Sequence, residues 1–358
     1  MEKDNFLFSI IVPVYNTEKY IEKCLSSIEK AMDSDCEVII VNDGATDDSE
    51  EVIKTFISNL PEKYKNNFVY IKKENKGLAD TKNVGIKNAR GKYISVVDSD
   101  DYISEDFYDV ARKHIENCDI IVYDLYVIYE KDKSWNYVGR AYKDDKKEEI
   151  VSLLNGAMSG SSCNKIIKKE LYNNHEFPVG KEYEDTAVTP FILTEASKID
   201  YVPYAMYYYL QREKSIVASN TLVSAFYKIC NNITTVIEQK GNDFDKYQNV
   251  INEFFVDRIF EIFIQELDEQ KKNFLDSIKD FRKNNIKTLE YIVNTNMVYN
   301  LENHYTDRQK KMVSNVFTFL VEEKFENVKR EFDKRKVVNY CRNIIKNFKI
   351  FLKSIVNR

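Results

Sequence analysis

Residues 6–47 read FLFSIIVPVYNTEKYIEKCLSSIEKAMDSDCEVIIVNDGATD and set the pattern for the first third of the chain. Two nearly continuous apolar runs, Phe6–Val14 and Val38–Val41, enclose Thr17–Lys30, whose apolar residues recur with helical spacing. Strands that are apolar without alternation are typical of a sheet covered on both faces, as parallel sheets are. The stretch therefore predicts a strand–helix–strand unit with a right-handed crossover.

The alternation of strand-like and helix-like segments continues to about residue 122. Apolar runs at Phe68–Ile71, Tyr93–Val97 and Ile120–Val122 predict three further strands. Asp47–Leu60 places its apolar residues on one helical face and predicts a second helix. Strands and helices in this order predict an α/β domain with a mostly parallel sheet flanked by helices.

The composition changes after about residue 220. Gly241 is the only glycine or proline beyond Pro203, and mixtures of Phe, Ile, Tyr, Lys and Glu run to the end. This predicts an all-α region, so we expect two domains, 1–219 and 220–358. Residues 334–358 carry eight Lys or Arg and no Asp or Glu, and their helical pattern is amphipathic. Two hypotheses for this segment stay open: it binds an anionic membrane surface, or it packs on the protein or on a second copy in a homo-oligomer.

Composition and charge exclude several classes of protein. The 358 residues include 25 Tyr and 21 Phe, which is more burial than a disordered chain provides. The net charge of −5 gives no support for nucleic acid as a partner. No apolar run approaches the roughly 18 residues of a spanning helix, and we expect no signal peptide. Six scattered cysteines without a CxxC spacing are typical of reduced thiols, so we expect a cytoplasmic protein.

Polar residues follow the predicted strands at the edge where open α/β sheets bind their ligands. The first strand runs into Tyr15 and Asn16, the second into Asp43 and Gly44, and the fourth into Asp98–Asp101. Neither a Gly-x-Gly-x-x-Gly motif nor a Walker lysine loop is present, which argues against a nicotinamide-dependent oxidoreductase and a P-loop nucleotidase.

The Asp98–Asp101 segment places three carboxylates in four residues. They repel one another unless a cation lies among them, and hard oxygen ligands favour Mg²⁺ or Mn²⁺. The alternative is an acidic N-terminal cap for a helix that starts near Ser104.

A series of motifs in fixed order and spacing carries a resemblance to a known family. The series consists of Pro13-Val14-Tyr15-Asn16, Asn42-Asp43-Gly44-Ala45-Thr46-Asp47, Asn75–Gly85, Ala89-Arg90-Gly91-Lys92-Tyr93, Asp98-Ser99-Asp100-Asp101, Asn164-Lys165, Glu184-Asp185-Thr186 and Tyr207–Ile216. It resembles family 2 glycosyltransferases, which are inverting, nucleotide-sugar-dependent enzymes with a GT-A fold. The resemblance covers about residues 6–219, and residues 220–358 lie outside it.

The resemblance implies a site for the sugar nucleotide. Pro13, Tyr15 and Asn16 would bind the donor, with the ring of Tyr15 against the base, and Asp43 would accept a hydrogen bond from a uracil N–H. From the residues alone, a core tyrosine and an Asx-turn at Asp43-Gly44 are the alternatives. The transferred sugar is expected to be a UDP-linked hexose or N-acetylhexosamine.

The resemblance also implies contacts with the ribose, the diphosphate and a divalent ion. The implied ligands are Asn75 and Lys82 near the ribose and diphosphate, Asp98 at the ribose, Asp100 at Mn²⁺ or Mg²⁺, and Arg212 and Ser215 closing over the diphosphate. The ion would stabilise the charge of the leaving nucleoside diphosphate. The chain departs from the family pattern at Thr81-Lys82-Asn83, where Ala-Arg-Asn is usual, and at Ala45, where serine is usual. Lysine supplies charge but no bidentate fork. A surface position is the alternative for Arg212.

Asp185 is the expected catalytic base. Inverting transfer needs one carboxylate to take the proton of the acceptor hydroxyl, and the family pattern assigns this role to the second acidic residue of Glu184-Asp185-Thr186. Adjacent residues point in different directions, so only one of the two faces the sugar. An ordinary acidic helix start is the alternative. The expected acceptor is a glycan, lipid-linked or protein-linked, as in bacterial polysaccharide synthesis.

Two other functions compete with a glycosyltransferase. A sugar nucleotidyltransferase usually carries a Gly-rich basic loop after its first strand, and Pro13-Val14-Tyr15-Asn16 differs from that pattern. A catalytically idle scaffold with the same fold has no need of the carboxylate set Asp43, Asp98, Asp100 and Asp185. The sequence therefore favours the enzyme.

Overall fold

The computed structural model describes residues 6–116, 118–138, 161–212, 256, 259, 263, 274–295, 297–300 and 306–332. The chain divides into two compact units, Met1–Ala218 and Ser219–Arg358. The predicted site residue Ser215 and the basic segment 334–358 lie outside the described residues.

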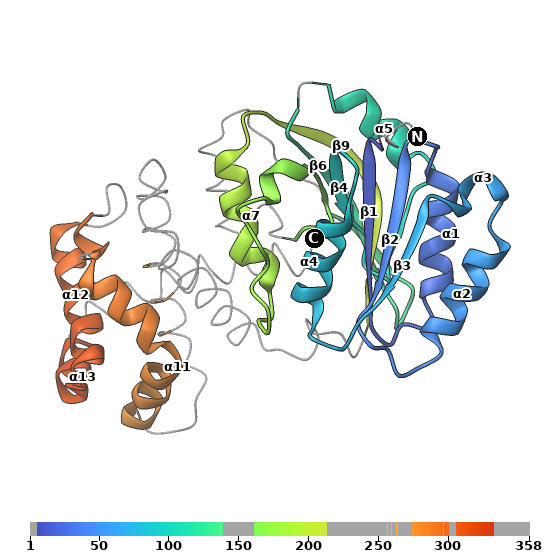
Figure 1. Cartoon of the computed structure of the whole chain (residues 1–358). Helices are drawn as coiled ribbons and strands as arrows, with labels where there is room; N and C mark the ends of the chain where they lie inside the picture. Colours follow the sequence, from blue (N-terminus) through green and yellow to red (C-terminus); the bar gives the residue numbers. More distant parts are fainter. Residues whose placement is uncertain are drawn as a thin grey trace. The chain divides into compact units, whose positions relative to one another are not determined.

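The first unit is an α/β domain (Figure 1). Its elements are, in order, β1 (Phe8–Val14), α1 (Ile21–Ala31), β2 (Cys36–Asn42), α2 (Ser49–Asn59), α3 (Glu62–Lys65), β3 (Phe68–Lys72), α4 (Leu78–Asn88), β4 (Tyr93–Val96), β5 (Tyr102–Ile103), α5 (Phe107–His114), β6 (Ile120–Tyr129), β7 (Trp135–Val138), β8 (Lys165–Lys168), η1 (Lys169–Tyr172), α7 (Glu184–Glu195) and β9 (Ile199–Gln211). The predicted strands are confirmed as β1, β2, β3, β4 and β6, and the predicted helices as α1 and α2.

One mixed sheet runs through the unit in the order β3-β2-β1-β4-β8-β6-β9-β5, with β7 paired to β6. The strands β1 to β4 are mutually parallel where they pair, whereas β8 runs antiparallel to both β4 and β6. β2, β1 and β4 are neighbours, so the segments that follow them emerge at one edge of the sheet.

Helices cover both faces of the parallel strands, as continuous apolar strands require. In Figure 1, α4 and α7 lie on one side of β1 to β3, and α1 and α2 lie on the other. The apolar stripe of α1 packs with Phe8, Ile10 and Val12 of β1, and each fully buried Ile or Leu contributes about 1.5–3 kcal/mol. On the opposite face, Gly85 lets α4 approach closely, since an added Cβ would lie 2.3 Å from Ile11 Cγ2.

A buried polar group lies at the other end of these strands. The Glu37 side chain has no exposed surface, and its Oε1 accepts hydrogen bonds from Ser9 Oγ at 2.6 Å, Arg90 N at 2.5 Å and Gly91 N at 3.2 Å. Its Oε2 accepts from Arg90 Nε at 2.8 Å. Gly91 lies against β1, where an added Cβ would be 2.6 Å from Ser9 N. The Arg90-Gly91 motif therefore stabilises the sheet at the amino-terminal ends of its parallel strands, opposite the edge at which the predicted site residues lie.

Four tyrosines form a row across the strands that extend the sheet. The register pairs Tyr102 with Tyr208, Tyr208 with Tyr126, and Tyr126 with Tyr137, from β5 through β9 and β6 to β7. The rings of Tyr102 and Tyr208 stack with centroids 4.6 Å apart, and those of Tyr126 and Tyr208 at 5.4 Å. Cross-strand aromatic pairs stabilise a sheet by about 0.2–1 kcal/mol each. The row joins β5, which follows the acidic Asp98–Asp101 segment, to the long strand β9.

The described part of the second unit is helical, as predicted. It contains α11 (Phe274–Asn294), η3 (Met297–Asn300), α12 (Asp307–Val321) and α13 (Phe325–Phe332). Ile278, Phe281, Val313, Phe317 and Val328 are buried there.

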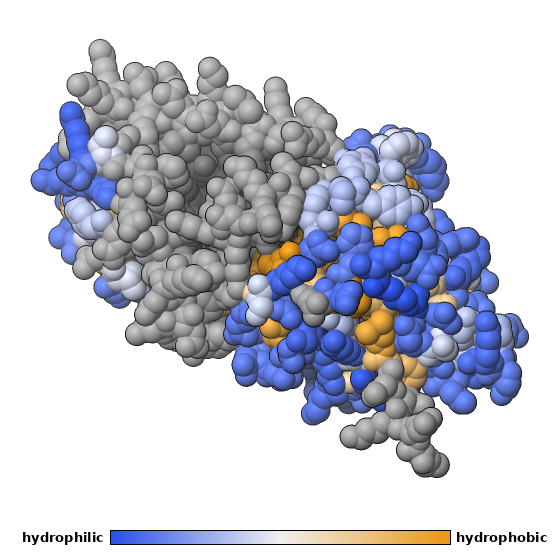
Figure 2. Space-filling view, turned by 90° about the horizontal axis from the view of Figure 1, so that it is seen from above, coloured by the Kyte–Doolittle hydropathy of each residue, from blue (hydrophilic) through white to orange (hydrophobic). Residues whose placement is uncertain are grey.

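The surface of the described residues is mostly polar, and the described cysteines are buried. On the face seen in Figure 2, the described residues are mostly hydrophilic, and hydrophobic residues show only in patches between them. Within the described residues, no helix combines the length and apolarity needed to cross a membrane. Cys24, Cys36, Cys118 and Cys163 are buried free thiols, as predicted for these four.

Candidate functional site

The loops after β1 and β2 are joined at the sheet edge. Asn16 adopts a positive φ of 52°, and its Oδ1 accepts a hydrogen bond from Thr46 N at 2.8 Å. Pro13 is buried within β1, whereas Tyr15 is 48% exposed. The alternative of a core tyrosine is therefore wrong, and the ring of Tyr15 is available to a ligand.

Asp43 holds the loop between β3 and α4. Its carboxylate accepts hydrogen bonds from Lys76 N at 2.9 Å and Gly77 N at 2.8 Å, and it forms an ion pair with Lys73. These partners lie at least 30 residues away, so the carboxylate does not form a local Asx-turn. Gly44 has a φ of 68°, and an added Cβ would lie 3.1 Å from Asn75 N. The exposed Asn75 is thus held beside the β2 loop.

The three carboxylates of Asp98–Asp101 repel one another, as expected, but each has different hydrogen-bond and ion-pair partners. Asp101 is buried and accepts hydrogen bonds from Tyr207 Oη at 2.6 Å and Leu210 N at 2.7 Å, so it anchors the loop to β9. Helix α5 begins at Phe107, with Asp106 as its N-cap residue. The alternative in which Asp101 caps this helix is therefore wrong.

Asp98 and Asp100 face the site with different partners. Asp98 Oδ1 is buried and has no hydrogen-bond partner among the described residues. Burial raises the pKa of Asp98 to about 7, and Lys82 opposes the rise. Asp100 Oδ2 forms an ion pair with Arg212 Nη2 at 2.6 Å. Burial raises the pKa of Asp100 as well, and the Arg212 guanidinium opposes it.

Arg212 is a partly buried residue at the end of β9, not a free surface arginine. Its side chain is 26% exposed, and its guanidinium lies over the Tyr20 ring at 5.2 Å from the centroid. Tyr20 Oη in turn donates to Glu130 Oε1 at 2.6 Å. The last described residue of the first unit therefore brings a positive charge to Asp100.

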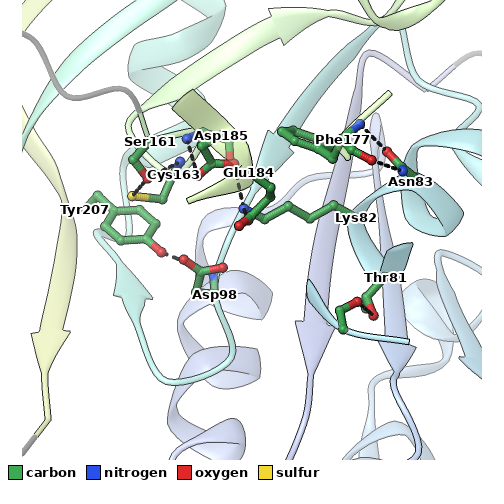
Figure 3. A network of polar contacts seen from close by, with 12 residues as sticks. Thr81, Lys82, Asn83, Asp98, Ser161, Cys163, Phe177, Glu184, Asp185 and Tyr207 are labelled. Atoms are coloured by element: carbon green, nitrogen blue, oxygen red, sulfur yellow. Dashed lines mark hydrogen bonds and ion pairs between the residues drawn. The ribbon is translucent and has the colours of Figure 1, made fainter. Parts of the chain in front are cut away.

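Lys82, Glu184 and Asp185 form a buried ion-pair network (Figure 3). Lys82 Nζ lies 2.8 Å from Glu184 Oε1 and 2.7 Å from Asp185 Oδ1, and the lysine side chain is 2% exposed. Burial lowers the pKa of Lys82, but Asp185 and Glu184 more than offset this, so the pKa lies well above its ordinary value. Burial raises the pKa of Glu184, against the effect of Lys82. Both acidic residues lie in the first turn of α7, and both point to the same ammonium group.

Two serines hold the Asp185 carboxylate from the other side. Ser162 N donates to Asp185 Oδ2 at 3.0 Å, Ser162 Oγ donates to Oδ1 at 3.1 Å, and Ser161 Oγ donates to Oδ2 at 3.4 Å. The side chain of Asp185 is 15% exposed, compared with 7% for Glu184. Neither serine is among the predicted site residues, because no motif or periodicity in the sequence singles them out.

Asn83, next to Lys82, fixes α4 to the segment before α7. Asn83 Nδ2 donates to Phe177 O at 2.8 Å, and Phe177 N donates to Asn83 Oδ1 at 2.9 Å. Figure 3 shows this reciprocal pair beside the Lys82 ion pairs. Adjacent residues of α4 thus attach the same distant segment at two points.

The residues fit a divalent ion that is shared with a bound phosphate ligand. Among the described residues, no group of three or more His, Cys, Asp or Glu side chains is arranged to hold a metal ion by itself. Mg²⁺ is usually held by one or two carboxylates together with substrate phosphates. Asp100, whose carboxylate lies at this sheet edge beside Arg212, supplies an oxygen ligand of this kind.

The fold and site define a GT-A-like glycosyltransferase domain, and comparisons with known proteins agree. Residues 9–175 match the model of glycosyl transferase family 2. The glycosyltransferase GlyG of Streptococcus pneumoniae is 32% identical over 224 residues, which are 59% of this chain and 73% of GlyG. The chain belongs to glycosyl transferase family 2 and is a glycosyltransferase, as the sequence predicted.

Other relatives extend the comparison. The glycosyltransferase GlyA of S. pneumoniae is also 32% identical, over 58% of this chain, but the match spans 31% of GlyA. A crystal structure of S. aureus TarS 1–349 in complex with UDP-GlcNAc superposes with a TM-score of 0.66 at 20% identity, covering 92% of this chain and 91% of that one. This likeness shows the same fold.

Proposed function

We propose that the protein catalyses inverting, divalent-metal-dependent transfer of a sugar from a nucleotide sugar to a hydroxyl of a glycan or glycoconjugate. The donor is a UDP-linked hexose or N-acetylhexosamine. One observation carries the proposal: Asp43 follows β2, Asp98 and Asp100 follow β4, and these two strands flank β1 on either side. Lys82 connects the same sheet edge to the acidic start of α7. The TarS complex with UDP-GlcNAc, which shares the fold, supports the choice of UDP.

The donor binds across the ends of β1, β2 and β4. The exposed Tyr15 ring packs on the base, Asp43 accepts from the uracil N–H, and Pro13, Asn16 and Asn75 shape the surrounding loops. Asp98 Oδ1 accepts a hydrogen bond from a ribose hydroxyl, because this buried oxygen has no partner within the described ranges and so gains most from a new hydrogen bond.

The diphosphate is bound at Asp100 and Arg212. Asp100 would hold Mn²⁺ or Mg²⁺, which supplies positive charge to the leaving nucleoside diphosphate. Arg212 is held at this point by its ion pair with Asp100. Its planar guanidinium suits bidentate phosphate recognition. We assign Ser215 the same role of binding the diphosphate.

Asp185 is the proposed base. Its carboxylate takes the proton of the acceptor hydroxyl while that oxygen attacks the anomeric carbon. The bond from the anomeric carbon to the phosphate oxygen breaks on the opposite side, and the nucleoside diphosphate leaves with the electron pair. The hydrogen bonds from Ser162 fix the carboxylate, and its greater exposure distinguishes it from Glu184. Fixed geometry of this kind lowers the entropic part of the barrier.

A pair of matched substitutions tests the function. A panel of nucleotide sugars with Mn²⁺ first identifies the donor through release of nucleoside diphosphate. Asp185→Asn keeps size but cannot take a proton, so transfer should fall by about 10²–10⁴-fold with UDP affinity nearly unchanged. Glu184→Gln, which leaves Lys82 and Asp185 paired, should lower transfer less than about 10-fold. The reverse order of effects would assign the base to Glu184, and full activity of both variants would refute the proposed mechanism.

A further inference from the structure

Lys82 is almost fully buried beside Glu184 and Asp185. Its side chain is 2% exposed, and its ammonium group donates to Glu184 Oε1 and Asp185 Oδ1. The Phe177 ring lies 5.3 Å from the same nitrogen. In Figure 3 the lysine extends from α4 toward the two carboxylates. A contact with the diphosphate would require this enclosed ammonium group to become accessible to a ligand.

We propose that Lys82 is a positioning residue for the catalytic base Asp185, and that Arg212 supplies the positive charge for the diphosphate. This inference rests on the proposed function. Two adjacent carboxylates at the start of α7 repel each other, and the ammonium group between them holds both in one arrangement. Removing one partner of a buried ion pair leaves an uncompensated buried charge, which is strongly destabilising. Without Lys82, the two carboxylates are therefore expected to leave their present positions.

Lys82 and Ser162 fix the plane of the Asp185 carboxylate together. Lys82 and the Ser162 hydroxyl donate to Oδ1, and the Ser162 N–H donates to Oδ2. The longest contact is that of Ser161 with Oδ2 at 3.4 Å. Oδ2 is therefore the oxygen that an acceptor hydroxyl reaches most readily, while Lys82 holds the other oxygen in place.

The two cations at the sheet edge differ in availability. Arg212 has a 26% exposed side chain and, within the part of the chain that the structure describes, one carboxylate partner, Asp100. Lys82 has two carboxylate partners and is almost fully enclosed. The more exposed Arg212 can therefore contact the diphosphate of the donor, whereas the enclosed Lys82 supports the base Asp185.

The test compares Lys82→Met, Lys82→Arg and Lys87→Met. Methionine matches the length of lysine without its charge, arginine keeps the charge, and Lys87 is an exposed residue on the same helix. Initial rates give kcat and the donor KM, and calorimetry with UDP and Mg²⁺ gives the Kd of UDP. Misplacing a reacting group by about 1 Å lowers a rate by about 10²-fold. Lys82→Met should therefore lose about 10²-fold in kcat, with the donor KM and the Kd of UDP within about 3-fold. Lys82→Arg should recover most of the loss, and Lys87→Met should match the wild type.

Other outcomes overturn the inference. A rise of about 10-fold or more in the Kd of UDP for Lys82→Met would show that the lysine binds the diphosphate. If Lys82→Met does not fold, Lys82→Met combined with Glu184→Gln removes the repulsion, and wild-type kcat in that protein would refute the positioning role. If the wild type is active and Lys82→Met is equally active, the positioning role of Lys82 is refuted and the proposed function is not. A wild type that turns over no nucleotide sugar refutes the proposed function, and the positioning role with it.

Discussion

Replacing Glu37 by glutamine tests whether the Arg90-Gly91 motif serves the fold or the donor. The Glu37 carboxylate is fully buried and receives four hydrogen bonds, three at Oε1 and one at Oε2. Glu37→Gln keeps an oxygen for the first three donors but turns an amide N–H₂ toward Arg90 Nε–H. The perturbation therefore removes one charge-assisted bond and weakens three others.

The magnitude follows from this geometry. A hydrogen bond to a charged group contributes about 1.5–3 kcal/mol, and neutral bonds are roughly half as strong as charged ones. One lost bond and three bonds weakened by about half lower the free energy of unfolding by about 4–7 kcal/mol. For a unit of this size, about 2–4 °C per kcal/mol corresponds to a fall in Tm of roughly 8–28 °C. Glu37 lies six residues before Asp43, which is roughly 20 Å along an extended strand, so kcat/KM measured below the transition should stay within about twofold.

The assay is urea and thermal denaturation followed by circular dichroism, together with hydrogen exchange of the β1 and β2 amides. Glu51→Gln is the matched control, because Glu51 is exposed on α2 and surface substitutions usually change stability by less than about 0.5 kcal/mol. A loss below about 1 kcal/mol for Glu37→Gln would refute the structural role of the motif. A large loss of donor affinity with unchanged stability would assign the motif to the donor instead.

Two further predictions concern packing of the base and acid stability. Asn83→Ala removes both hydrogen bonds to the Phe177 backbone, so it should lower the free energy of unfolding by about 2 kcal/mol. The fold change in kcat should be larger than the fold change in the Kd of UDP. Urea denaturation and steady-state kinetics measure these effects, and an unchanged kcat would contradict the prediction. The Arg112 guanidinium hydrogen-bonded to Asp35 lowers the pKa of that carboxyl, so the pair stabilises the fold above the unfolded pKa of about 3.9, and this contribution is lost as the pH falls through the lower folded value. Asp35→Asn should accordingly flatten the acid limb of stability against pH in urea denaturation, and an identical limb would show that Asp35 does not contribute.

The sequence determined the fold of the first unit and the edge at which its site lies. A continuous apolar run such as Phe6–Val14 indicates a strand whose two faces are both buried. Because this signal lies within a few consecutive residues, it locates the strand without knowledge of the strands that pair with it. The position of Asp43 and Asp98 after such runs then places them at one edge, because the carboxyl ends of parallel strands meet there. The order and spacing of the motifs gave the family.

The tertiary structure alone decided which polar groups meet. Lys82 and Asp185 are separated by 103 residues, and no periodicity in the sequence connects them. Asp98, Asp100 and Asp101 are nearly adjacent in sequence, but packing against β9 pairs Asp101 with Tyr207 and Leu210 and pairs Asp100 with Arg212. Asp98 Oδ1 has no hydrogen-bond partner among the residues that the structure describes. The physical reason is that apolar burial leaves a repeating pattern along the chain, whereas a buried polar side chain takes whichever partner the packing of distant segments brings within about 3 Å of it.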